Sequence, residues 1–275
     1  MTMSIDRAGL DRGRVASLLA DAEWTLPMPI ALETTTSTNA EVATLALAGA
    51  AEGTCVVADE QTAGRGRQGR DWASPPSAGL WMSFLVRPGS VPRARWGWLP
   101  LLAGLAARDA IGTLGRIPVG LKWPNDLMVD AGAGLGMRKL GGILAEASGS
   151  KDAAGGEAVV LGIGINAALA AHELPTPSAT SLLVEGGSVD REALLVAVLR
   201  HLVLRLEQWR HSDEHLTRDY RAACLTLGRI VEVSLPGGRI ERGEAVSIDE
   251  DGHLQVFSEG ILVSVTAGDV IHATI

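Results

Sequence analysis

Apolar residues recur along the chain with two spacings, one typical of helices and the other typical of strands. The helical spacing is clearest between residues 190 and 210, where the apolar positions are Leu194, Leu195, Val198, Leu202 and Leu206. Further helices are predicted at 7–22, at 39–50 with Asn39 as N-cap, at 92–115, and at 212–226 with Ser212 as cap. Short apolar runs between them predict strands at 30–33, 55–58, 119–121, 127–129, 139–146 and 159–166. This alternation predicts an α+β fold, a mixed β-sheet with flanking helices.

After Gly228 the pattern changes to an alternation of period two. The alternating runs are 230–235, 244–248, 254–257 and 261–265, separated by turn signals at 236–238, 251–252 and 259–260. We expect five short strands here, forming a small barrel, and a domain boundary that separates residues 1–227 from 228–275. Residues 1–28 are expected to form a short N-terminal helical extension, and the glycine-rich stretches 132–136 and 152–156 are expected to be mobile turns.

Composition narrows the class of protein. The chain has 275 residues and a formal net charge of −8, which argues against a general nucleic-acid-binding protein. No apolar run approaches the roughly 20 residues of a membrane span, and no signal-peptide core precedes the first helix. Two cysteines make a disulfide framework improbable and favour a reducing cytoplasm. The six histidines lack metal-ligand spacing, so no metal-binding residue is predicted.

Residues 60–72, with the sequence EQTAGRGRQGRDW, form a basic, glycine-rich segment in this acidic chain. Its glycines permit tight turns and close backbone approach, and its arginines suit phosphate or carboxylate. Gly64, Gly66 and Gly69 match the dinucleotide fingerprint, but that fingerprint must open a helix. Pro75 and Pro76 forbid a helix after the segment, so the nicotinamide interpretation fails. The choice left is a loop that closes over an anionic ligand or a mobile loop with no ligand.

Two further patterns suggest a ligand-binding sheet. The segment 121–127, LKWPNDL, predicts a hairpin that places Lys122 and Trp123 at a sheet edge; the alternative is a hairpin with Trp123 in the core and Lys122 in solvent. The runs 139–146 and 159–166 each carry two glycines inside a predicted strand. Glycine weakens a strand unless something approaches the backbone closely, so either a ligand or a tightly packed helix is expected there.

In this order, these segments resemble the biotin protein ligase family, from about residue 30 to the C-terminus. The matching residues are Ser37-Thr38-Asn39, Gln61, GRGRQGR at 64–70, KWPNDL at 122–127, KLGGIL at 139–144 and GIGIN at 162–166. The resemblance implies the catalytic fold shared with class II aminoacyl-tRNA synthetases, followed by an SH3-like C-terminal domain. About 30 residues precede the first predicted strand, too few for a DNA-binding winged helix, so the monofunctional class without repressor activity is expected.

The resemblance also implies an activity and the residues that serve it. Biotin would be activated by Mg²⁺-ATP to biotinoyl-5′-AMP and passed to a lysine of a biotin carboxyl-carrier domain of a carboxylase. The implied catalytic residues are Lys122 and Arg67. Biotin contacts are implied for Ser37, Thr38, Asn39, Gln61, Gly64, Arg65, Arg67, Lys122, Gly141, Gly142, Gly162 and Gly164. ATP or adenylate contacts are implied for Arg65, Arg67, Arg70, Trp72, Trp123, Asn125, Lys139 and Asn166.

Three rival interpretations stay open at this point. A lipoate or octanoyl ligase is the nearest rival among enzymes, a non-catalytic biotin sensor or repressor comes from another class, and a nucleotide-binding scaffold would transfer nothing. The chain is expected to be a monomer or a homodimer. Because an acyl-adenylate hydrolyses when water reaches it, residues 63–72 are expected to be disordered without ligand and ordered with it.

Overall fold

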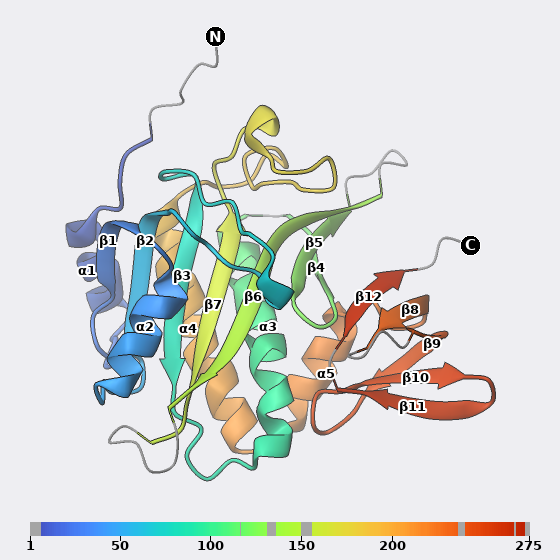
Figure 1. Cartoon of the computed structure of the whole chain (residues 1–275). Coiled ribbons are helices and arrows are strands. Elements are labelled where there is room, and N and C mark those ends of the chain that lie inside the picture. Colours follow the sequence, from blue (N-terminus) through green and yellow to red (C-terminus); the bar gives the residue numbers. More distant parts are fainter. Residues whose placement is uncertain are drawn as a thin grey trace.

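The computed structural model describes residues 7–115, 117–130, 136–149, 156–235, 240–266 and 268–272. A seven-stranded sheet forms its centre, with the spatial order β1-β2-β3-β7-β6-β5-β4 (Figure 1). Its strands are β1 (Ile30–Thr35), β2 (Cys55–Gln61), β3 (Gly79–Val86), β4 (Val119–Lys122), β5 (Asp126–Asp130), β6 (Met137–Ser148) and β7 (Ala158–Asn166). Only β1 and β2 run parallel; the other neighbouring pairs are antiparallel. The predicted mixed sheet is confirmed.

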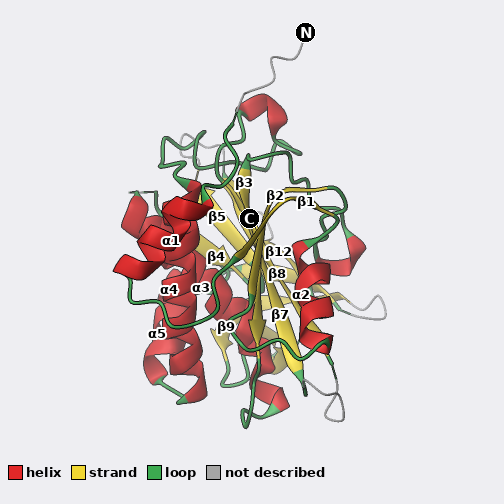
Figure 2. Ribbon diagram, turned by 90° about the vertical axis from the view of Figure 1, so that its left-hand side faces the viewer, coloured by secondary structure: helices red, strands yellow, loops and turns green. Residues whose placement is uncertain are grey.

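The helices cover the two faces of this sheet unequally (Figure 2). They are α1 (Arg12–Asp21), α2 (Thr38–Leu47), α3 (Trp98–Leu114), α4 (Arg191–Arg210) and α5 (Glu214–Ala223), with 3-10 turns at Arg67–Gly69, Arg93–Gly97 and Ala171–Glu173. All helices but α2 lie on one side, where the main hydrophobic core forms between α3, α4 and the sheet. Among the described α-helices only α2 packs on the opposite face, through Val42 and Ala46, so much of that face has no described α-helix over it.

The alternation of residues along β7 sets the character of the two faces. Leu161, Ile163 and Ile165 join the main core on the helical side. The residues between them, Gly162 and Gly164, point to the opposite face, because successive side chains of a strand alternate. That face therefore carries no side chain at these two positions of β7.

Several predicted helix ends differ from those observed. The α2 helix begins at Thr38 with Ser37 as N-cap, so the prediction of Asn39 as the cap is wrong. The α5 helix is capped by Asp213, which accepts a hydrogen bond from the amide of His215 at 2.9 Å, and the prediction of Ser212 as cap is also wrong. In both places a neighbouring polar residue lies in the extended conformation that an N-cap requires.

The remaining helices differ mainly in length from the predicted ranges. The segment predicted as one helix over 92–115 begins with the 3-10 turn Arg93–Gly97, and the α-helix starts at Trp98. The N-terminal helix is shorter than the predicted 7–22 and starts after Asp11, which caps it. The prediction for 190–210 is confirmed, with Asp190 as N-cap of α4.

The C-terminal region forms a five-stranded antiparallel sheet with the order β11-β10-β9-β8-β12. Its strands are β8 (Ile230–Ser234), β9 (Ile240–Ile248), β10 (Leu254–Ser258), β11 (Ile261–Val265) and β12 (Asp269–His272). The predicted number of five strands is confirmed, and β12 is the strand that the four alternating runs did not locate. The predicted turn at 236–238 and most of 132–136 and 152–156 lie outside the described residues. The indole N–H groups of Trp98 and Trp123 donate to the carbonyls of Glu250 and Gly252, at 2.8 and 3.2 Å. This sheet is therefore joined to the region of the seven-stranded sheet by hydrogen bonds as well as by a shared core.

No helix in the described part of the chain is long and apolar enough to cross a membrane.

Candidate active site

A single row of residues crosses the open face of the large sheet. Directly opposite residues in antiparallel strands share a face, so their pairing can be followed from strand to strand. From β2 to β4 the row is Ala58, Trp81, Gly164, Gly142, Asp126 and Lys122. The two glycines form a bare floor, and charged residues stand at one end of it. At the usual strand spacing, Lys122 lies about 14 Å from Gly164 along the row.

A β-bulge brings a second lysine to this face. In the pairing of β5 with β6, Leu127 lies opposite Gly141 and Met128 lies opposite Lys139, so Leu140 is skipped. Leu140 is fully buried in the core on the helical side. The extra residue reverses the alternation, and Lys139 therefore shares a face with Gly142. Its ammonium forms an ion pair with the Asp126 carboxylate at 2.6 Å.

The basic segment forms a short hairpin rather than an irregular loop. The amide of Arg70 donates to the carbonyl of Arg67 at 3.2 Å, and the Trp72 amide donates to the Gly64 carbonyl at 2.9 Å. Gln68 and Gly69 have φ values of +56° and +72°, the pattern of a tight hairpin turn. Gly64 serves close approach instead, because a Cβ there would stand 2.5 Å from the Trp72 carbonyl oxygen. No α-helix follows the segment, which agrees with rejection of the dinucleotide fingerprint.

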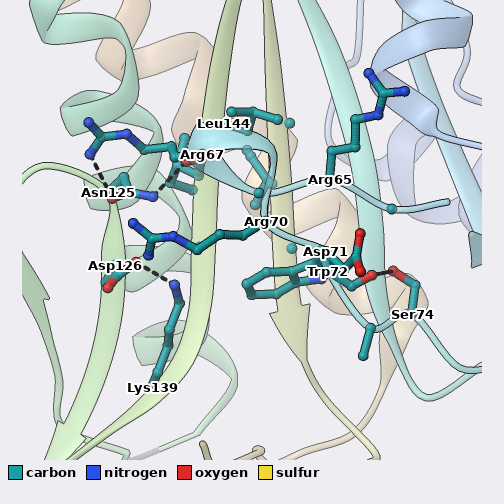
Figure 3. Close-up of a pocket in the computed structure, with 18 of the residues that line it drawn as sticks. Arg65, Arg67, Arg70, Asp71, Trp72, Ser74, Asn125, Asp126, Lys139 and Leu144 are labelled. Atoms are coloured by element: carbon teal, nitrogen blue, oxygen red, sulfur yellow. Dashed lines mark hydrogen bonds and ion pairs between the residues drawn. The ribbon is translucent and has the colours of Figure 1, made fainter. Parts of the chain in front are cut away.

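The arginines of this hairpin point in two directions (Figure 3). Arg67 and Arg70 extend over the sheet toward β5, whereas Arg65 points the other way. The Arg67 guanidinium donates to Asn125 Oδ1 and to the carbonyl of Gly268, both at 3.2 Å. Burial lowers the pKa of Arg67, and the negative charge of Asp126 opposes that shift. Arg67 thus links the hairpin to β5 and to the C-terminal sheet.

Trp72, at the end of the hairpin, lies on the glycine floor. A Cβ on Gly164 would stand 2.8 Å from its ring, and a Cβ on Gly142 would stand 3.2 Å from it. The ring meets Trp81 edge-on at 6.3 Å between centroids, and the Lys139 ammonium lies 5.4 Å from its centre. The indole nitrogens of Trp72 and Trp81 are buried without a hydrogen-bond partner in the described part of the chain. Two orphaned donors beside a bare floor indicate a place for a ligand with acceptor atoms.

A polar network forms the other end of the site, near the start of α2. The Gln61 side-chain oxygen accepts from the Thr38 amide at 2.9 Å, and its nitrogen donates to Ser74 Oγ at 2.9 Å. The fully buried Ser83 hydroxyl lies 2.7 Å from Thr38 Oγ1 and 2.5 Å from Asn39 Oδ1. This network holds fixed donors and acceptors beside Gly162, a geometry suited to a neutral polar ring.

The electrostatics of Lys122 differ from those of Lys139. Burial lowers the pKa of Lys122, Asp126 opposes the shift, and the charges of Lys139 and Arg70 add to it. No hydrogen bond or ion pair of the Lys122 ammonium is found among the described residues, whereas Lys139 is paired with Asp126. Lys122 is therefore a partly desolvated cation with a free donor group.

These features surround one cavity of about 880 Å³, in the range usual for ligand sites. It is lined by all but one of the residues that the sequence marked: Ser37, Thr38, Asn39, Gln61, Gly64, Arg65, Arg67, Arg70, Trp72, Lys122, Trp123, Asn125, Lys139, Gly142, Gly162, Gly164 and Asn166. Gly141 is the exception, since it does not line the cavity. A Cβ there would meet the Gly164 carbonyl at 2.5 Å and Leu127 at 2.8 Å, so this glycine serves packing.

Two of the lining residues are held mainly by protein contacts. Trp123 is 2% exposed, and its indole N–H donates to the Gly252 carbonyl. This agrees with the alternative in which Trp123 lies in the core. The side-chain Nδ2 of Asn166 donates to the Thr180 carbonyl at 2.9 Å.

Sequence reasoning also missed part of the site. Asp126 stands inside the KWPNDL segment, but the motif alone assigns it no role, and Ser83 carries no motif signal. Further unpredicted lining residues come from β3, from β6, from 175–179 and from β12, and include Trp81, Met82, Ile143, Leu144, Pro175, Thr176, Ser178, Ala179, Val270 and Ile271.

Comparison with known proteins agrees with this geometry. Residues 31–166 match the model of the biotin/lipoate A/B protein ligase family, and residues 226–273 match the biotin protein ligase C-terminal domain. The chain is 44% identical to a biotin–[acetyl-CoA-carboxylase] ligase of Mycobacterium tuberculosis over 243 residues, 86% of each protein. It is 34% identical to a bifunctional ligase/repressor of Bacillus subtilis, covering 82% of this chain and 68% of that protein. Among solved structures, a biotin protein ligase from Aquifex aeolicus in complex with biotin and ATP is similar, with a TM-score of 0.74 and 28% identity over 89% of this chain and 99% of that one.

Proposed function

The chain belongs to the biotin/lipoate A/B protein ligase family, and from this premise we propose that it is a biotin protein ligase. It activates biotin with ATP and transfers the biotinyl group to a lysine of a biotin carboxyl-carrier domain. The observation that carries the proposal is the row of residues on the open face. It joins a bare glycine floor to a cluster of cations at one end, with the Gln61–Thr38 network at the other.

The reaction has two steps, and neither needs a covalent bond to the protein. A biotin carboxylate oxygen attacks the α-phosphorus of ATP, the bond to the β-phosphate oxygen breaks, and pyrophosphate leaves. The acceptor lysine, as a free amine, then attacks the carbonyl carbon of biotinoyl-5′-AMP and loses a proton, and AMP leaves with the bonding electrons. Both steps depend on positioning and charge neutralisation more than on acid–base chemistry.

The proposed roles follow the charge along the row. The uncharged ureido ring lies at the Gln61–Asn39 end, and the hydrocarbon chain crosses Gly164 and Gly142. The carboxylate and the α-phosphate then meet the cations, where Lys122 and Arg67 offset the repulsion between the two anions. Lys139 stands directly beside the floor, with a Cβ on Gly142 placed 3.5 Å from its ammonium. Lys139 is therefore a second catalytic candidate, equal in standing to Lys122.

Other proposed contacts concern the nucleotide and the acceptor. Arg65, Arg70, Trp72, Asn125 and Asn166 remain candidates for ATP or adenylate contact. Mg²⁺ would be carried by the ATP phosphates, since the described residues hold no cluster of three or more His, Cys, Asp and Glu side chains. The described cysteines are both buried and unpaired, which supports our proposal of a reducing cytoplasm. Residues 228–275 are proposed as a separate domain, and the protein as a monomer or homodimer.

Transfer of labelled biotin to a purified carrier domain tests the function. Wild type, Lys122→Ala and Lys139→Ala are compared with Arg218→Ala, which changes an exposed cation of α5. We expect label on the carrier with wild type and Arg218→Ala, and strong loss in at least one lysine variant. A panel of biotin, lipoate and octanoate in the pyrophosphate-release assay decides between ligase types. Pyrophosphate release with lipoate but not biotin would replace the biotin assignment, and absence of adenylate with every acid would refute the ligase proposal.

A further inference from the structure

One wall of the cavity is a segment that lies outside the recognised motifs. Residues 167–182 form the first part of the connection from β7 to α4, and Pro175, Thr176, Ser178 and Ala179 line the cavity. The segment also hydrogen-bonds to the backbone of Lys139. The Lys139 amide donates to the Ser178 carbonyl at 2.7 Å, and the Thr180 amide donates to the Lys139 carbonyl at 2.8 Å.

These bonds hold the backbone of Lys139, which adjoins the bulged residue Leu140. A bulge disrupts the ladder of hydrogen bonds between strands and leaves backbone groups unpaired. The wall segment pairs alongside β6 at this point, with Lys139 and Ala179 as register partners. The position of Lys139 over the floor therefore depends on the position of residues 178–180.

The other end of the wall segment is fastened by Arg7. Its guanidinium makes a two-pronged contact with the Glu173 carboxylate, one prong being 3.2 Å between Nη1 and Oε1, and donates to the Ala168 carbonyl at 2.8 Å. Glu173 in turn accepts from the amide of Ala170 at 2.8 Å. The Arg7 and Glu173 side chains are only 11% and 22% exposed, so solvent screens this pair weakly.

Arg7 is itself held firmly in place by the catalytic-fold region. The Leu10 amide donates to the Asp59 carboxylate at 3.1 Å, and Arg191 donates to the Ala8 carbonyl at 3.3 Å. Arg191 also pairs with Asp59 at 2.5 Å and is buried. The segment 7–10 is thus a fixed strap, although it lies before residue 31, where the family match begins.

We propose that Arg7 is a positioning residue for the active site, acting through Glu173 and the wall segment on Lys139. This inference rests on the proposed function. When Arg7 is lost, residues 168–180 are held less firmly and the Lys139 backbone loses its hydrogen bonds to Ser178 and Thr180. The Lys139 ammonium then moves away from the nucleotide phosphates. The expected signature is a raised KM for ATP with a smaller change in kcat. The displacement of Lys139 should weaken ATP binding more than it slows the bond-forming step.

The test compares Arg7→Ala with Glu173→Gln, the double variant, and Arg7→Lys. Arg14→Ala is the matched control, since Arg14 also ties the N-terminal region to the body, through Asp190 and Glu192, but away from the wall segment. We expect Arg7→Ala to raise the KM for ATP about tenfold, within the range of coupling through contact networks. The double variant should be no worse than Arg7→Ala, Arg7→Lys should recover part of the loss, and Arg14→Ala should leave the KM unchanged.

Hydrogen exchange of residues 168–180 in the free protein supplies a readout that needs no turnover. Faster exchange there in Arg7→Ala, but not in Arg14→Ala, supports the strap even if the wild type proves inactive with biotin. In that case the proposed function is refuted, but the positioning role of Arg7 is not. An unchanged KM for ATP, with exchange in 168–180 equal to wild type, would overturn the inference.

Discussion

Replacing Gly164 with alanine tests whether the bare floor exists for a ligand. In the free protein the added Cβ would stand 2.8 Å from the nearest ring atom of Trp72. Ordinary carbon contacts lie at about 3.5–4.0 Å, so the ring must withdraw by roughly 1 Å. Trp72 belongs to a surface hairpin, so that movement is easier than a shift inside the main core.

Two opposing effects set the expected change in the free energy of unfolding. Overpacking costs about 1–3 kcal/mol in a closed core, and the movable hairpin places the cost at the low end of that range. Removing a glycine from a strand returns about 0.5–1 kcal/mol. We therefore expect a net destabilisation of about 1 kcal/mol or less. A ligand pressed against Gly164 has no such relief, so its affinity should fall about 10- to 100-fold, equivalent to about 1.4–2.8 kcal/mol.

Calorimetric titration with biotin measures the affinity, and thermal unfolding measures the stability. Gly104→Ala is the matched control, because a Cβ there would lie at an ordinary 3.5 Å from Leu121, on the helical side of the sheet. The double variant Trp72→Ala/Gly164→Ala is compared with Trp72→Ala alone. If Gly164 is bare only to admit the tryptophan, the two will bind biotin equally. Wild-type affinity in Gly164→Ala itself would refute the ligand floor.

Three further outcomes are expected. Asp126→Asn removes the anion that pairs with Lys139 at 2.6 Å. Calorimetry should therefore show that metal-free pyrophosphate binds this variant about three- to tenfold more tightly than the wild type. Weaker binding would mean that Asp126 supports the phosphate site. The pKa of Lys122 is lowered by burial from 10.5, so its cation carries a folding penalty that is present at low pH and is relieved as pH rises through the lowered pKa. Lys122→Met should accordingly raise the free energy of unfolding near neutral pH. Lys122→Arg should keep adenylation active at alkaline pH, where the wild type declines. Superimposable pH–rate profiles of the wild type and Lys122→Arg would contradict a catalytic cation at this position. Burial raises the pKa of Cys55 to about 12, so its thiol should resist an aromatic disulfide reagent at pH 8 until the protein unfolds, and rapid native labelling of Cys55 by mass spectrometry would show that the core opens.

Features that depend on local spacing can be predicted from the order of residues alone. The alternation in β7 predicts both its apolar helical side and its bare side, because side chains of a strand alternate whatever lies around them. The helix at 191–210 follows from its apolar stripe, and Pro75 and Pro76 suffice to exclude a helix after the basic segment. The order of the motifs was enough to indicate the family.

Which side chains meet over the glycine floor depends instead on how the folded strands pair. Strict alternation places Lys139 and Gly142 on opposite faces; the bulge at Leu140 puts them on one face, and nothing in the local pattern KLGGIL requires that bulge. Ser83 lies 44 residues from Asn39, its hydrogen-bond partner, and Arg7 lies 166 residues from Glu173. Such pairs form because the fold brings distant parts of the chain together. Their energy depends on burial and partner geometry, which the folded chain creates and local spacing does not encode.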